Sequence, residues 1–255
     1  MRMKAKKFGF IASAFGTLVI VTTAWVFWGH LLVDIDEPLI IRAARRGDWD
    51  RVRELTSVQD DVLKTHGTRL LVRACYQGEI EAADYLIGRG VSVDESNDVG
   101  VTPLGSSIMG GQTLVAKLLL DRGCDVEFTG ADGLTPLLQA VVLGQVEISG
   151  LLLEKQANPS ARTPAGWTAL HLAVRTDPPR SIVKSYDRRK LVALLIEHGA
   201  DVNERNEGGI EWEQRHDSGP LGRTSRMSKE VSAIGIARDR GFVDIIDLLD
   251  EHGAR

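Results

Sequence analysis

Hydrophobic and polar positions form two different patterns along the chain. Residues 8–33 form one apolar run that contains no Asp, Glu, Lys or Arg. From about residue 37 onward, short apolar stretches recur at helical spacing and are separated by glycines. A membrane-spanning helix needs about 20 apolar residues, so the first run is long enough for one. The second pattern predicts a series of short amphipathic helices.

The apolar run predicts a transmembrane signal-anchor helix at residues 8–33, preceded by a basic tail at residues 1–7. The tail carries four cations, and acidic residues follow the run at 34–37. Because cations gather on the cytoplasmic side of spanning helices, we expect a single-pass protein of the cell membrane. Its N-terminus would be cytoplasmic and its main domain extracytoplasmic, which means periplasmic in a bacterium. Two alternatives stay open: a cytoplasmic main domain, and secretion after cleavage near Thr22-Thr23-Ala24.

The remaining pattern repeats every 33 residues. Gly67, Gly100, Gly133 and Gly166 follow one another at this interval, and the last three begin the segments GVTPL, GLTPL and GWTALHLA. Thr followed by Pro suits the start of a helix, because Thr caps the first turn and Pro needs no hydrogen bond there. A glycine between the two apolar stretches of each unit favours a turn. Each unit therefore predicts two short helices.

Two-helix units cannot bury their apolar faces alone, so neighbouring copies must share one core. The 33-residue period, the Thr-Pro-Leu-His variants and endings such as LLIEHGADVN (residues 194–203) resemble the ankyrin repeat. The resemblance covers residues 37–254 and implies an all-α solenoid of about six helix-pair repeats, with hairpin fingers along one side. The expected domain at residues 34–255 would then comprise repeats at about 37–66, 67–99, 100–132, 133–165, 166–208 and 209–255.

Two insertions interrupt the period. The fifth repeat spans 43 residues, ten more than the rule, and the additional residues fall around 177–189, where Pro178-Pro179 stops the first helix. Residues 175–190 contain six cations and two acids. The second insertion, at about 209–229, includes Trp212. Long connections in compact arrays are either functional or loosely ordered, and the sequence leaves both alternatives open.

The resemblance also implies that a partner binds at the finger tips and at exposed positions of the first helices. In the middle of this array those positions are apolar, with Arg45 and Arg46 toward one end and Arg240 toward the other. An apolar centre with a charged rim is the anatomy of a protein-binding surface. The candidate partner-binding residues are Val101, Met109, Leu134, Val142, Leu143, Trp167, Arg175 and Trp212.

One alternative would close this surface. The insertion around 177–189 would fold over Val142 and Leu143, and Trp167 would pack on the neighbouring finger. The apolar side chains would then stabilise the fold instead of binding a partner.

Charge is distributed unevenly along the chain. The net charge is −4, but four of the 31 cations lie in residues 1–7, which leaves 27 cations and 35 acids in residues 34–255 and a net charge of −8 there. An acidic domain disfavours nucleic acids and other anionic partners. Cys75 and Cys124 are too few for a disulfide scaffold, so packing is the expected role of both.

Motifs for catalysis are missing from the sequence. It contains no phosphate-binding loop, no His-Glu-x-x-His zinc helix and no Gly-x-Ser-x-Gly nucleophile turn. We therefore expect no enzyme activity, catalytic residue, cofactor, metal or small-molecule substrate. His171 occupies the Thr-Pro-Leu-His position, and the resemblance implies a structural hydrogen bond from it to the hydroxyl of Thr168.

These patterns favour a membrane-anchored protein–protein interaction scaffold that binds an unidentified protein partner through the concave face and fingers of an ankyrin array. A preformed surface loses little entropy on binding. The alternative function is a module that binds a membrane surface or lipid headgroups through the basic residues 175–190, each cation contributing about 1 kcal/mol.

Overall fold

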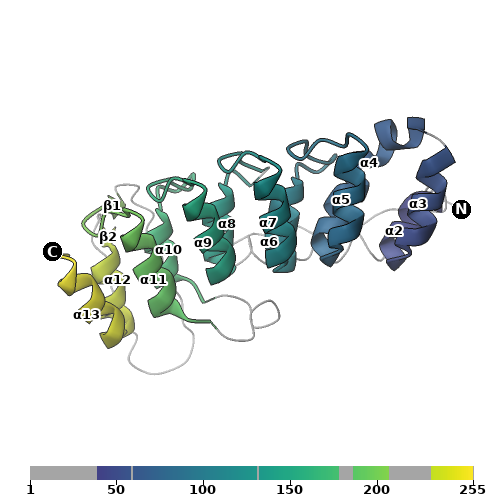
Figure 1. Cartoon of the computed structure of the whole chain (residues 1–255). Helices are drawn as coiled ribbons and strands as arrows, with labels where there is room; N and C mark the ends of the chain where they lie inside the picture. Colours follow the sequence, from purple (N-terminus) through teal and green to yellow (C-terminus); the bar gives the residue numbers. More distant parts are fainter. Residues whose placement is uncertain (1–38, 59, 131, 178–185, 207–230, 255) are drawn as a thin grey trace, which may run out of the picture.

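The computed structural model describes residues 39–58, 60–130, 132–177, 186–206 and 231–254. These residues form twelve helices, which Figure 1 shows as six pairs placed side by side in one row. The all-α, helix-pair solenoid is thereby confirmed. The pairs are α2 (Leu39–Arg46) with α3 (Trp49–Val58), α4 (Asp60–Gln77) with α5 (Ile80–Gly88), α6 (Pro103–Gly110) with α7 (Thr113–Asp121), α8 (Pro136–Val142) with α9 (Val146–Glu154), α10 (Ala169–Arg175) with α11 (Arg188–Glu197), and α12 (Ala233–Arg240) with α13 (Val243–Glu251).

The structure does not test the predicted membrane-spanning segment. Residues 1–7 and 8–33 lie outside the described residues. Among the helices that the structure does describe, none is long and apolar enough to cross a bilayer.

Threonine and serine side chains fix the starts of four of the first helices. Thr102, Thr135, Thr168 and Ser232 each precede a helix and accept a hydrogen bond from the backbone N–H three residues further along the chain. Proline occupies the first helical position after Thr102 and Thr135, as the sequence predicts. Helix α6 is followed by Gly111, whose φ of 66° is a left-handed conformation that glycine adopts without steric cost.

First helices form one layer of the array and second helices the other. Along the row α4 packs on α6, α6 on α8, α8 on α10 and α10 on α12, while α5, α7, α9, α11 and α13 follow one another in the second layer. One leucine position recurs in successive second helices, at Leu86, Leu119, Leu152 and Leu195, and each of these side chains is fully buried. Burying such a side chain stabilises the fold by about 1.5–3 kcal/mol. Each pair is therefore sealed by its neighbours.

From the second pair onward, hairpin fingers connect successive pairs and lie along one edge of the row (Figure 1), whereas a single residue separates α3 from α4. In one of them β1 (Arg205–Asn206) pairs antiparallel with β2 (Val231–Ser232). Side chains also join neighbouring fingers, because Asp94 Oδ1 accepts the backbone N–H of Asp125 at 2.8 Å. These contacts hold the fingers in line with the helices.

Helix α10 ends differently from the other first helices. It is followed by Thr176 in an extended conformation instead of a left-handed glycine, as Pro178-Pro179 predicts. The carbonyl groups at its end are capped by a side chain from the start of α11. Arg188 Nη1 donates to three of these oxygens at 3.0–3.1 Å, those of Ala173, Val174 and Thr176.

Candidate functional site

Five residues occupy the same place in five successive first helices. Four of them lie two positions before the glycine of the helix turn, and the fifth is the last residue of α10. All five side chains are half-buried. We call these residues the inner row: Arg45, Tyr76, Met109, Val142 and Arg175. The inner row has an apolar and aromatic centre with an arginine at each end.

The structure places the predicted binding residues unequally. Val101, Met109, Leu134 and Val142 are half-buried, so part of each side chain remains accessible. Trp212 lies outside the described residues. Among the predicted binding residues, the accessible apolar side chains therefore belong to the third and fourth repeats.

Leu143 and Trp167 are buried, with only 8% and 4% of their surfaces exposed. The expectation of an open apolar surface is therefore wrong for these two residues. Leu143 follows α8 directly and packs within the continuous core. The Trp167 ring lies beneath Arg175, whose guanidinium carbon is 4.8 Å from the ring centroid, and it meets the His171 ring edge-on at 5.7 Å. Residues 178–185 of the insertion, the predicted cover, lie outside the described residues.

His171 makes the structural hydrogen bond that the sequence predicts. Its Nδ1 lies 2.7 Å from Thr168 Oγ1, and its Nε2 lies 3.0 Å from the carbonyl oxygen of Val231. Because a carbonyl only accepts, Nε2 carries the proton and Nδ1 accepts from the threonine hydroxyl. Burial lowers the pKa of His171 below 6.5, since the charged ring would lose hydration. A neutral His171 therefore links α10 to β2.

At the Arg175 end of the inner row, a network of polar side chains joins the fifth and sixth pairs. Asp177 accepts from Arg188 Nη2 at 2.5 Å and from Arg240 Nη2 at 2.7 Å, and Arg240 also donates to the carbonyl oxygen of Arg175. Burial, and then the charge of Arg240, lowers the pKa of Arg175. The Phe242 ring contacts both the Arg188 and Arg240 guanidinium groups. Arg188, one of the six cations of the basic insertion, is therefore committed to internal contacts.

Two exposed apolar residues on neighbouring fingers escape prediction from the sequence. Val99 and Phe128 are 56% and 40% exposed. They belong to the segments 91–101 and 124–134, each of which contains three acids and no Lys or Arg. An apolar residue within an acidic finger segment is the signal that could have identified them. The fingers thus combine apolar contacts with negative charge.

Both cysteines are free and buried in the array. Burial is the main cause that raises the pKa of each thiol, to about 12 for Cys124. Because the thiolate is the reactive form, we expect neither cysteine to react with a colorimetric thiol reagent in the folded chain and both to react after unfolding in urea. Rapid reaction of either thiol in the native protein would contradict this prediction.

Comparison with known protein families identifies the array. The model for ankyrin repeats, which spans three copies, matches residues 39–130 and 123–206. These matches cover more than half of the chain, and the chain belongs to the ankyrin-repeat family. Ankyrin repeats imply a protein–protein interaction scaffold, and the family is typically non-enzymatic. Among curated proteins, none matches this chain.

Proposed function

We propose that the chain is a membrane-anchored scaffold whose inner row binds a protein partner. The observation that carries this proposal is the line of half-buried Tyr76, Met109 and Val142 between two arginines. Protein interfaces combine apolar and aromatic anchors at the centre with a charged rim. The helices that bear the inner row are fixed by packing on their neighbours, so binding orders few groups and loses little entropy.

The fingers favour a partner with a basic surface. The segments 91–101 and 124–134 carry six acids in total and no cation. Exposed Val99 and Phe128 supply apolar contacts beside this negative charge. Complementary charge accelerates association and selects against acidic partners.

The apolar run at residues 8–33 would hold the array at the membrane. An anchor confines the scaffold and a membrane-bound partner to one surface, which raises their effective concentration. With a cytoplasmic N-terminus, the array lies outside the cytoplasm. Protease added to intact cells or spheroplasts is then expected to digest the array, whereas protection until the membrane is broken would contradict this orientation.

Crosslinking in cells tests the inner row directly. A photoreactive amino acid at Met109 is expected to capture a partner protein, because this side chain lies at the centre of the row. Leu114 is the matched control: it is also apolar and is 67% exposed, but it lies on α7 in the other layer. Equal capture from the two positions would contradict the proposed surface.

Substitution of two inner-row residues measures how much their side chains contribute to partner binding. The double variant Tyr76→Ser and Val142→Ser should weaken partner capture from Met109 about tenfold or more, since anchor residues contribute more than about 1 kcal/mol each. Because both side chains are half-buried and Val142 packs against the core, some loss of thermal stability is also expected, so capture is compared at a temperature at which circular dichroism shows the variant folded. Undiminished capture by the folded double variant would place the binding surface elsewhere.

A further inference from the structure

Glutamines that follow two of the helix turns cover the turn of the preceding pair. Gln112 lies over Gly78, where a Cβ atom would clash with the glutamine Oε1, and its Nε2 donates to the carbonyl oxygen of Tyr76 at 3.3 Å. Gln145 lies over Gly111, where a Cβ atom would be 3.0 Å from its Nε2. These glutamines fill the space between consecutive helix turns.

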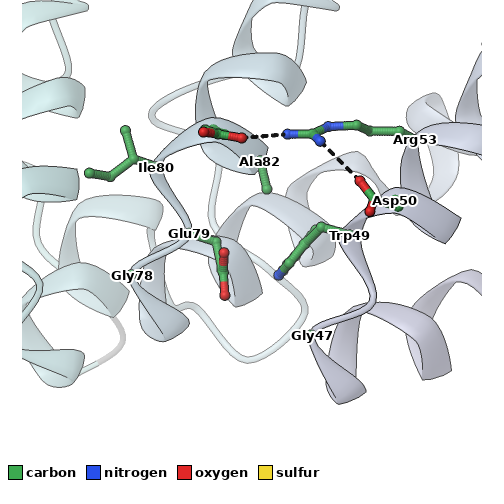
Figure 2. A pocket seen from close by; sticks show the side chains of 9 residues that line it. Gly47, Trp49, Asp50, Arg53, Gly78, Glu79, Ile80 and Ala82 are labelled. Atoms are coloured by element: carbon green, nitrogen blue, oxygen red, sulfur yellow. Dashed lines mark hydrogen bonds and ion pairs between the residues drawn. The ribbon is translucent and has the colours of Figure 1, made fainter.

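Glu79 stands in the corresponding place between the first and second pairs, and the space there is open. A Cβ atom on Gly47 would meet no atom of the described residues within 4 Å. A carboxylate has no proton to donate to the carbonyl of Arg45, whose oxygen accepts from Arg73 Nη2 at 3.2 Å and Gln77 Nε2 at 3.4 Å instead. As a result, a groove of about 520 Å³ lies between these two turns (Figure 2).

A buried hydrogen-bond donor lines this groove. Trp49 is 7% exposed, and its indole Nε1–H finds no partner among the described residues. Figure 2 shows the indole nitrogen at the end of the side chain that points toward Glu79. A buried donor without an acceptor is costly. The nitrogen itself has almost no accessible surface, so a small shift of the Trp49 side chain is needed before a ligand that supplies an acceptor gains this interaction.

Carboxylates determine the charge of the groove. Asp50, Glu79 and Glu81 line it together with one guanidinium, that of Arg53. Arg53 pairs with Asp50 at 3.2 Å and with Glu81 at 3.4 Å, as the dashed lines in Figure 2 mark. Within the part of the chain that the structure describes, Glu79 makes no ion pair. Exposed Ile80 adds an apolar wall beside this carboxylate.

We propose that this groove binds an arginine side chain of a protein partner. The guanidinium pairs with Glu79, and the main-chain carbonyl of the bound residue accepts from Trp49 Nε1. Arginine fits because the lining is negative overall. Its planar guanidinium also carries several N–H donors, which suit the two acceptor oxygens of a carboxylate. The site lies at the turns of the first two pairs, away from the centre of the inner row, and does not depend on the function proposed above.

An NMR titration of the ¹⁵N-labelled full-length chain tests the site, with N-acetyl-arginine N-methylamide as the probe. The Trp49 indole N–H resonance, assigned by its loss in Trp49→Phe, is expected to move downfield and to saturate, because a new hydrogen bond deshields the proton. N-acetyl-citrulline N-methylamide has nearly the same shape without the charge. We expect it to bind about tenfold more weakly or worse.

Two neighbouring glutamates give a matched pair of variants. Glu79→Gln removes the carboxylate that faces the groove and should weaken the arginine probe about tenfold or more. Glu81→Gln changes a carboxylate that already pairs with Arg53, so binding should stay within about twofold. An unchanged Trp167 indole resonance reports that each variant is folded.

A saturating shift with the arginine probe that is lost in Glu79→Gln and kept in Glu81→Gln supports the site. The proposal is overturned if the Trp49 resonance does not move, if the citrulline probe moves it as strongly, or if both glutamine variants bind alike.

Discussion

Replacement of Arg188 by alanine is expected to lower the free energy of unfolding by about 3 kcal/mol. The guanidinium donates to three carbonyl oxygens at the end of α10 and pairs with Asp177, and only 13% of the side chain is exposed. Without it, the oxygens of Val174 and Thr176 lose this donor in a partly buried place, whereas that of Ala173 still accepts from the Tyr186 hydroxyl at 3.1 Å. Contacts of the guanidinium with the rings of Tyr186 and Phe242, at 5.1 and 4.4 Å, are lost as well. Urea unfolding followed by circular dichroism measures the loss.

Two further variants define the cause of that loss. Arg188→Lys keeps the charge, but a single ammonium cannot reach all of these oxygens, so the loss should be intermediate. Lys190→Ala removes a nearby exposed cation that lies 3.9 Å from Glu147, and it should cost less than about 0.5 kcal/mol. If alanine at position 188 costs no more than alanine at position 190, the carbonyl cap contributes nothing to stability.

His171→Ala is expected to lower the free energy of unfolding by about 2–3 kcal/mol. The ring joins Thr168 to the carbonyl of Val231 and so connects two helix pairs through their finger. Its removal leaves that carbonyl without this donor and opens a space beside Trp167. Thermal or urea unfolding of the two proteins in parallel measures the difference.

The same histidine should make stability depend on pH. Since burial holds the pKa of His171 below 6.5 in the folded chain, the unfolded chain binds a proton there more readily. Its contribution is fully present above pH 6.5 and is lost as the pH falls from 6.5 toward the folded pKa. His171→Ala should remove this part of the pH dependence, whereas His198→Ala, at the exposed end of α11, should retain it. Identical pH profiles for the unchanged chain and His171→Ala would argue against this origin.

The 33-residue spacing of glycines predicted the helix pairs that follow Gly100, Gly133 and Gly166, because a shared core requires the same apolar positions in every copy. Gly67, the first glycine of the series, instead lies inside the long helix α4. Thr102 and Thr135 marked helix starts through local chemistry alone, since the capping oxygen and the N–H that it binds lie three residues apart. The bond between Thr168 and His171 followed from the family pattern for the same reason. Short-range chemistry of this kind is visible in a single sequence.

The sequence could not predict which residues at the edge of the inner row are buried. Val142 and Leu143 are adjacent apolar residues at the end of α8, yet the first is half-buried and the second is buried. Successive helical residues point about 100° apart, so only the position of the next pair decides which one is covered. Trp167 is covered by Arg175, and this contact depends on how α10 ends.

The side chain that follows each helix turn differs from one pair to the next, and the repeat pattern did not predict what these differences do. Counted from Leu152 and Leu195, Arg188 occupies the place that Gln145 holds in the preceding pair. In this one position the chain places a carboxylate at 79, amides at 112 and 145, and a guanidinium at 188. The three chemistries give an open groove, covered turns and a helix cap, because they differ in their ability to donate to a carbonyl.

The polar contacts around the last two pairs have a consequence for how this chain can change over time. The pair of Arg188 and Asp177 closes the base of the segment at 178–185, and the links from His171 to Val231 and from Arg240 to Asp177 fix both ends of α12. The packing of the fifth pair on the sixth is therefore held by contacts between described residues that flank these two segments. We therefore expect that sequence within 178–185 and 207–230 can be lengthened or replaced while the fifth and sixth pairs keep their packing.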